Sequence, residues 1–205
     1  MAAIAPVSRA GGFRLAEIAL APDEHFDASR MSRASLFFIL GGTLLRHPSA
    51  EQLHAASDGD QAGLLVGVAK NDQFVEHFGP HPLFFTLNMR NPNCPARRLI
   101  TLELACPVVA SSCRSTPLFS MTPSFEPMRQ LFLRKTLRAL LLWCLSPDQA
   151  DWYSWHSFRV SLACAVLAAG APESIILALC RWRSRLVANL CQAQPRGLRT
   201  MARLR

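Results

Sequence analysis

The stretch from Trp152 to Ser184 constrains the fold of this chain most, because it holds start and stop signals for two consecutive helices. Ser154 or Ser157 can cap the free backbone N–H groups at a helix N-terminus. The apolar positions that follow have the spacing of one helical face, and they are Phe158, Leu162, Ala165, Val166 and Ala169. Gly170 ends this helix, and Pro172 begins a second one that runs to Cys180.

Donor side chains lie at both ends of this predicted helix pair. His156 and Arg159 are three residues apart, so both project from one face of the first helical turn. Arg181-Trp182-Arg183-Ser184 follows the second helix. An imidazole and a planar guanidinium suit two oxygens of a phosphate better than a metal ion. The pattern favours an anion site, and the alternative is an ordinary structural helix pair with a chance His-x-x-Arg spacing.

Taken together, these residues resemble the catalytic domain of the tyrosine recombinases, the phage-integrase family. His156-Ser157-Phe158-Arg159 is similar to the His-x-x-Arg box of that family, and Ala168-Ala169-Gly170-Ala171 to the small-residue turn after it. Trp182 stands where the family carries a second His or Trp. The similarity is close over the last third of the chain and weaker over most of the rest. The pattern is nearest to recombinase-like genes of mobile elements in eukaryotic genomes.

A stretch near the N-terminus resembles a second box of the same family, Gly-x-Arg-x-x-Glu. Here it comprises Gly12, Arg14 and Glu17. An arginine at a helix N-terminus adds its donors to the positive end of the helix dipole, and a carboxylate three residues later can hold the guanidinium. The alternative for such a pair is an exposed, solvated helix face.

The resemblance assigns a role to each matching residue. Arg14 and Arg159 would hold the phosphate oxygens and stabilise the transition state. Lys70, at the end of a predicted strand over 63–69, would be the general acid with His156 assisting, or else merely a solvated lysine. Trp182 would support the helix that carries the nucleophile. The resemblance implies no cofactor and no metal, because arginines supply the positive charge.

The nucleophilic tyrosine of the family is missing from its expected position. That position lies about nine residues after Trp182 and is occupied by Cys191. A thiolate is a poor match for a phosphoryl centre. The only tyrosine of the chain, Tyr153, precedes the His box, and a packing role is expected for it. The resemblance therefore implies a fold for DNA strand breakage and rejoining, hence for DNA recombination and integration, in a pseudoenzyme. The alternatives are a DNA-binding or interaction module without chemistry and a helical protein without a nucleic-acid role.

Codon degeneracy suggests why the tyrosine is missing. Codons permitted for residues 185–195, read one base later, can encode Gly-Ser-Ser-Leu-Thr-Tyr-Ala-Arg-Leu-Asn-Pro, which contains the missing family segment. We therefore expect a frameshift after about Ser184, with residues 1–184 as the recombinase-like domain and 185–205 as a basic, unstructured or out-of-frame tail. The helical DNA-clamp domain that the family places before the first arginine is also expected to be missing.

Composition agrees with a polyanionic partner. The chain has 22 Lys+Arg against 14 Asp+Glu, a net charge of +8, and its lysines are Lys70 and Lys135 alone. Arginine favours bidentate phosphate contacts, although the base composition of the gene could also enrich it. We expect double-stranded DNA as the partner, and the sequence leaves open whether copies assemble on it. The seven cysteines do not have the spacing of metal ligands. The sequence also shows neither a signal peptide nor an apolar run long enough to span a membrane. Together these features predict a soluble protein that is nuclear or otherwise intracellular.

Patterning along the rest of the chain predicts a mainly helical α+β fold with a small antiparallel sheet. Residues 30–45 predict two strands around Gly41-Gly42, 48–62 a polar helix or loop, 97–104 a helix, and 110–127 a loop. Residues 125–145 predict a long amphipathic helix whose polar side carries Arg129, Arg134, Lys135 and Arg138. That face is either solvated or in contact with phosphates beside the site. The resemblance supports this architecture more than periodicity does.

Overall fold

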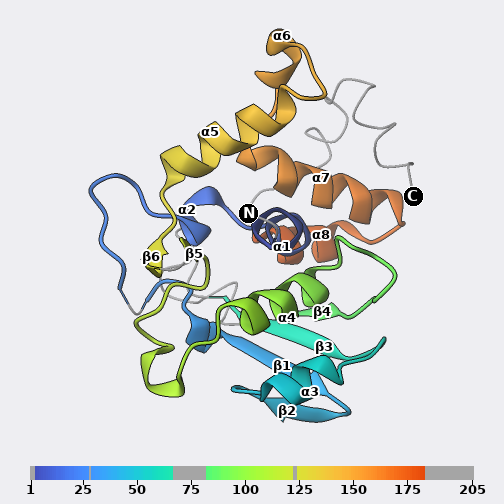
Figure 1. The fold of residues 1–205 in the computed structure, drawn as a ribbon. Coiled ribbons are helices and arrows are strands. Elements are labelled where there is room, and N and C mark those ends of the chain that lie inside the picture. Colours follow the sequence, from blue (N-terminus) through green and yellow to red (C-terminus); the bar gives the residue numbers. More distant parts are fainter. Residues whose placement is uncertain (1–2, 28, 67–81, 122–123, 183–205) are drawn as a thin grey trace.

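A computed structural model describes residues 3–27, 29–66, 82–121 and 124–182. Within these ranges the chain has an α+β fold with eight α-helices and a small antiparallel sheet (Figure 1). The coarse class predicted from the sequence is therefore confirmed. None of the helices in these ranges combines the length and the apolar character that crossing a membrane requires.

Helices and strands are interleaved along the described chain. The helices are α1 (Ile4–Gly11), α2 (Leu15–Ile18), α3 (Ala50–His54), α4 (Pro95–Ala105), α5 (Gln130–Leu141), α6 (Pro147–Ala150), α7 (Trp155–Ala168) and α8 (Glu173–Cys180). The strands are β1 (Leu36–Leu40), β2 (Thr43–Leu45), β3 (Gln61–Leu65) and β4 (Pro82–Thr86), with a short separate pair, β5 (Ser120–Met121) and β6 (Glu126–Pro127). Short 3-10 turns occupy Arg33–Ser35 and Ala110–Ser112.

The main sheet has the order β2-β1-β3-β4, and every neighbouring pair is antiparallel. The predicted β1–β2 hairpin is present, and its turn residues Gly41 and Gly42 have φ of 55° and 79°, which favours glycine. β3 begins at Gln61, two residues before its predicted start. β4 was not predicted as a strand, and its first residue, Pro82, lies on an edge strand, where a missing N–H is tolerated.

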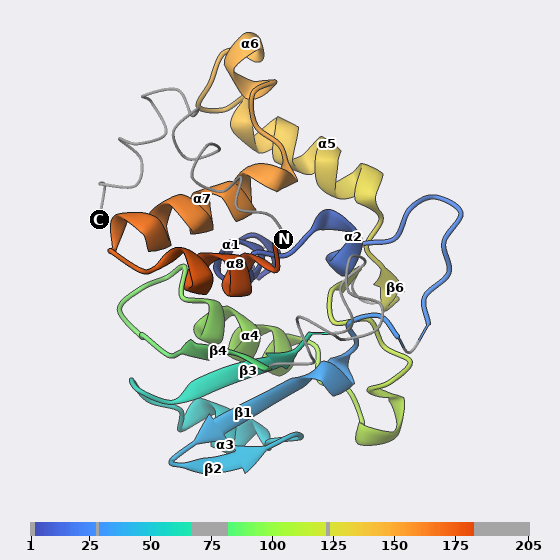
Figure 2. The same cartoon turned by 180° about the vertical axis from the view of Figure 1, so that it is seen from behind.

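One hydrophobic core joins the sheet to the helices. α4 packs on β3 and β4, and α1 lies between α4 and α7 (Figures 1 and 2). The side chains of Phe13, Phe38, Leu64 and Leu99 are almost completely buried there. The described chain therefore places its sheet on one side of α1 and the helices α5 to α8 on the other.

The predicted helix over residues 125–145 is shorter in the structure. α5 spans Gln130–Leu141, because the residues before it form β6 and a turn in which Phe125 has a positive φ of 55°. Arg129 precedes the helix and donates from Nη1 to the carbonyl oxygens of Ala21 and Glu24, at 3.0 and 2.8 Å. This arginine therefore fixes the start of α5 to the segment after α2.

The boundaries of the predicted helix pair are confirmed. Ser154 caps α7 and accepts a hydrogen bond from the His156 N–H at 3.2 Å. At the other end, the N–H of Gly170 donates to Leu167 and that of Ala171 to Val166, which is a Schellman motif. α8 begins directly after Pro172.

The predicted buried face of α7 is wrong by about one position. The buried residues are Trp155, Arg159, Val160 and Ala163, whereas Ala169 is exposed. Phe158, Leu162, Ala165 and Val166 are only partly buried. The reason is that α7 packs against both α1 and α8, which a single apolar stripe does not reveal.

Candidate anion-binding site

The turn after α1 places the first candidate arginine. Gly12, with φ 57°, ends α1 in a left-handed conformation that glycine adopts without strain. Phe13 is then fully buried, and Arg14 precedes the first turn of α2. The backbone N–H of Arg14 donates to Glu17 Oε2 at 2.8 Å. Glu17 thus caps the backbone at the start of α2, whereas the Arg/Glu spacing had predicted that it holds the Arg14 guanidinium.

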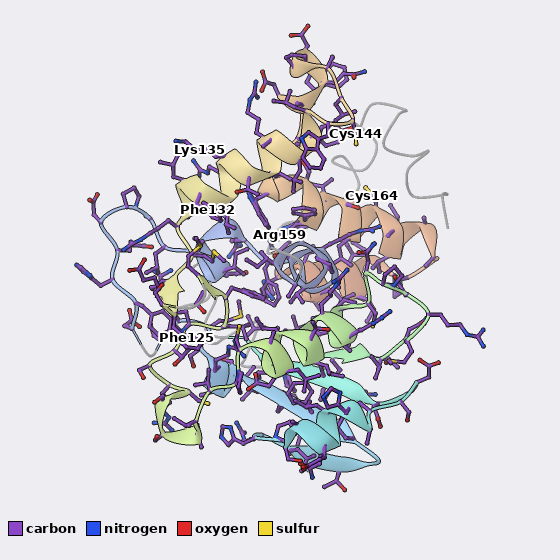
Figure 3. All side chains as sticks on the ribbon, viewed as in Figure 1. Phe125, Phe132, Lys135, Cys144, Arg159 and Cys164 are labelled. Atoms are coloured by element: carbon purple, nitrogen blue, oxygen red, sulfur yellow. The ribbon has the colours of Figure 1, made fainter. Side chains whose placement is uncertain are left out.

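Arg159 enters the site from the second helical turn of α7. Only 3% of its surface is exposed. Its Nη2 donates to the carbonyl oxygen of Cys180, and its guanidinium carbon lies 5.5 Å from the ring centre of Trp182. Figure 3 shows Arg159 in the middle of the molecule. The Arg159 guanidinium is therefore shielded from water and held in one position by a carbonyl oxygen and an indole ring.

Arg181 is a third arginine near the site, and no specific role was predicted for it. Arg181 is 7% exposed, and its Nη2 lies 2.7 Å from Glu17 Oε2. Arg14 Nη1 approaches the other oxygen, Glu17 Oε1, only to 3.8 Å, which is an ion pair without a hydrogen bond. Two guanidinium groups therefore approach the Glu17 carboxylate, which leaves an excess of positive charge. The signal that could have found Arg181 is its place in the basic group directly after α8.

A pocket of about 500 Å³ opens beside this cluster. It is lined by Arg14 and Leu15 of α2, by Arg134, Leu137 and Arg138 of α5, by Ala150, Asp151, Tyr153 and Ser154, and by Trp155, His156 and Arg159 of α7. Four arginines and a histidine thus face one space with a single carboxylate, that of Asp151, which forms an ion pair with Arg138. The volume lies in the range of ligand sites.

The structure brings three of the predicted site residues, Arg14, His156 and Arg159, to this pocket. Trp182 packs against Arg159, and Glu17 pairs with Arg14. Trp182 and Glu17 therefore each contact a residue of the pocket lining. Lys70 and Cys191 lie outside the described residues. Tyr153, for which packing was expected, lines the pocket.

Two pKa values at the pocket are lowered. Burial, together with the charge of Arg14, lowers the pKa of Arg159 to about 10, so this guanidinium is still charged at neutral pH. Burial lowers the pKa of the His156 imidazole below its usual value, and the charges of Arg159 and Arg14 lower it further. The site therefore favours the neutral form of His156.

Several buried donors of the site have no acceptor among the described residues. They include Arg14 Nη1 and Arg159 Nε. Leaving such donors unpaired is costly, and an anion with several oxygens would satisfy them. The same described ranges contain no group of three or more His, Cys, Asp or Glu residues arranged to bind a metal ion.

Comparison of the chain with protein-family models, with curated proteins and with solved structures finds no match. The function is therefore argued from the geometry of the pocket.

Proposed function

We propose that this chain is a tyrosine-recombinase-like domain that binds the phosphate backbone of double-stranded DNA in the nucleus and does not cleave it. The observation that carries the proposal is the buried Arg159, which lines one pocket together with Arg14, while Glu17 pairs with Arg14 and Arg181. Fixed guanidinium donors with an excess of positive charge are suited to a phosphodiester, which offers two non-bridging oxygens and one negative charge.

Two further arginines line the same pocket. Arg134 and Arg138 of α5 line the pocket, so a phosphate held by Arg14 and Arg159 would have further cations beside it. A backbone with a charge at each nucleotide matches such a row better than a single small anion does. The net charge of +8 would add long-range attraction.

A binding experiment tests this proposal. Anisotropy of a labelled 20-base-pair duplex, titrated at several salt concentrations, should give a log Kd that changes linearly with log salt, by about 0.9 per phosphate contact. Arg159→Ala should weaken binding about tenfold or more and reduce the slope by about one contact. Lys135→Ala is the matched control, because Lys135 is an exposed cation of α5 outside the pocket lining (Figure 3). Equal effects of the two substitutions, in folded variants, would contradict the proposal.

The second candidate function is strand transfer by this chain itself, and Tyr153 is the observation that favours it. Its side chain lines the pocket with Arg14, His156 and Arg159. In that case the phenol would lose its proton as its oxygen bonds to phosphorus, the bond to the 5′ oxygen would break, and the leaving oxygen would take up a proton.

A nicked suicide substrate separates the two candidates. Cleavage next to a nick releases a short strand and traps a covalent protein–DNA adduct that survives denaturing electrophoresis. The proposal predicts no adduct from the chain as written. An adduct that forms with this chain and disappears in Tyr153→Phe would establish the second candidate instead.

A further inference from the structure

The end of α8 and the two residues that follow it, 180–182, contact Arg159 directly and are linked to Arg14 through Glu17. The carbonyl oxygen of Cys180 accepts from Arg159, and the Trp182 ring packs against the same guanidinium. Between them, Arg181 pairs with Glu17 of α2. Three consecutive residues therefore join α7 to α2, which are the two elements that supply Arg159 and Arg14.

The backbone of Arg181 is adapted to this inward contact. Its φ of 50° and ψ of 51° are left-handed, a conformation that is unfavourable for a residue with a Cβ. The conformation is stabilised by the Arg181 N–H to Ala178 and the Trp182 N–H to Leu177, at 3.1 and 2.9 Å. The Arg181 side chain then covers the Phe13 ring at 5.2 Å and donates to the Gly12 carbonyl oxygen at 3.4 Å. Glycine is favoured at such a position, and here the gain comes from the side chain.

Glu17 is the link between Arg181 and Arg14. Its Oε2 accepts from the Arg14 N–H at 2.8 Å and pairs with Arg181 Nη2 at 2.7 Å, while its Oε1 faces Arg14 Nη1 at 3.8 Å. Arg181 is not among the described residues that line the pocket. It therefore reaches the bound anion only through Glu17 and the position of α2.

From these contacts we infer that Arg181 is a positioning residue, which holds Glu17 so that the Arg14 guanidinium is aimed at the phosphate. The inference rests on the proposed function. It differs from a purely electrostatic role, in which Arg181 would attract the anion by its charge alone. It also makes the end of α8 part of the site, although the pocket is formed by other elements.

A double-mutant cycle with Arg14 distinguishes positioning from direct attraction. If Arg181 acts through Arg14, then Arg181→Ala, Arg14→Ala and the double variant should all lose about the same affinity for the 20-base-pair duplex, on the order of tenfold. Arg181→Lys should recover part of the loss. Arg30→Ala is the matched control, since Arg30 also pairs with a nearby glutamate, Glu24 at 2.9 Å, but lies outside the pocket lining. Additive losses would overturn the inference.

The sign of a Glu17→Ala effect gives a second test, which does not depend on Arg181→Ala folding. Removal of a negative charge should strengthen DNA binding if charge alone matters. Positioning predicts the opposite, a several-fold weaker affinity, because Arg14 loses its support. Tighter binding by Glu17→Ala would overturn the inference. If Arg159→Ala weakens binding while Arg181→Ala does not, only the positioning role fails; if the unmodified chain does not bind DNA, the proposed function fails and this inference falls with it.

Discussion

The sheet and the helical arm of this protein bury apolar side chains to very different extents. We define the helical arm as residues 130–153, which comprise α5, α6 and the segment leading to α7. In the sheet, Phe38 and Leu64 are 1% and 0% exposed, whereas Phe132 and Trp143 of the arm are 39% and 84% exposed. Leu131, Leu140, Leu142 and Trp152 of the arm are exposed as well. The chain thus has a well-packed half and an arm held by few buried contacts.

The pocket lies between these two kinds of structure. Arg14 and Arg159 belong to helices that pack into the interior, while Arg134 and Arg138 belong to the arm. Groups fixed by packing are held ready for a ligand, and groups on a loosely held element adapt to it. Under the proposed function, Arg14 and Arg159 would fix the position of the phosphate, and the arm would adjust around it.

Truncation of an aromatic ring on each side should show the largest difference. Phe38→Ala removes a fully buried ring from the sheet, and the cavity and lost transfer free energy should lower the free energy of unfolding by about 3 to 5 kcal/mol. Phe132→Ala, on the arm, should cost less than about 1 kcal/mol. Urea denaturation followed by circular dichroism measures both. Similar losses for the two variants would show that something covers the arm in solution.

A smaller effect is expected within the arm itself. Leu133 is the one residue of α5 that is buried, with an exposed fraction of 0%, whereas Leu131 is 56% exposed. Leu133→Ala should lower the free energy of unfolding by about 2 to 3 kcal/mol, and Leu131→Ala by less than about 0.5 kcal/mol. Hydrogen exchange should also show faster opening of α5 in Leu133→Ala, with β1 and β3 less affected. Uniform acceleration throughout the chain would mean that the arm and the sheet unfold as one unit.

The smallest effect concerns pH at the wall of the pocket. The pKa of His156 is lowered from 6.5, so the folded state prefers neutral imidazole and loses stability as pH falls from about 6.5 through the lowered value. A bound phosphate favours the imidazolium, so DNA affinity should rise over the same window, by at most about tenfold per pH unit. The other charged or titratable groups of the pocket are Arg14, Arg134, Arg138, Asp151, Tyr153 and Arg159.

His156→Gln isolates the contribution of this imidazole. The variant should show a flatter dependence of duplex affinity on pH between 8 and 5.5 than the unmodified chain, measured at constant salt. An identical slope in both proteins would show that His156 does not take up a proton when DNA binds.

Local signals in the sequence determined the ends of several elements. Ser154, Gly170 and Pro172 set the limits of α7 and α8, and Gly41-Gly42 formed the β1–β2 turn. The start of α2 at Arg14 was likewise predicted. These features were predictable because each is completed by hydrogen bonds or backbone conformations within a few residues.

Only the tertiary structure decided which side chains point inward. Arg159 is buried because α7 packs against both α1 and α8, and Arg181 turns toward Glu17, which is 164 residues away in the sequence. The same packing brings Tyr153, Arg134 and Arg138 to the wall of one pocket. Contacts of this range leave no trace in local spacing, since they depend on where separate elements meet. The sequence therefore determined where α7 and α8 begin and end, and the packing of the helices decided which arginines the site contains.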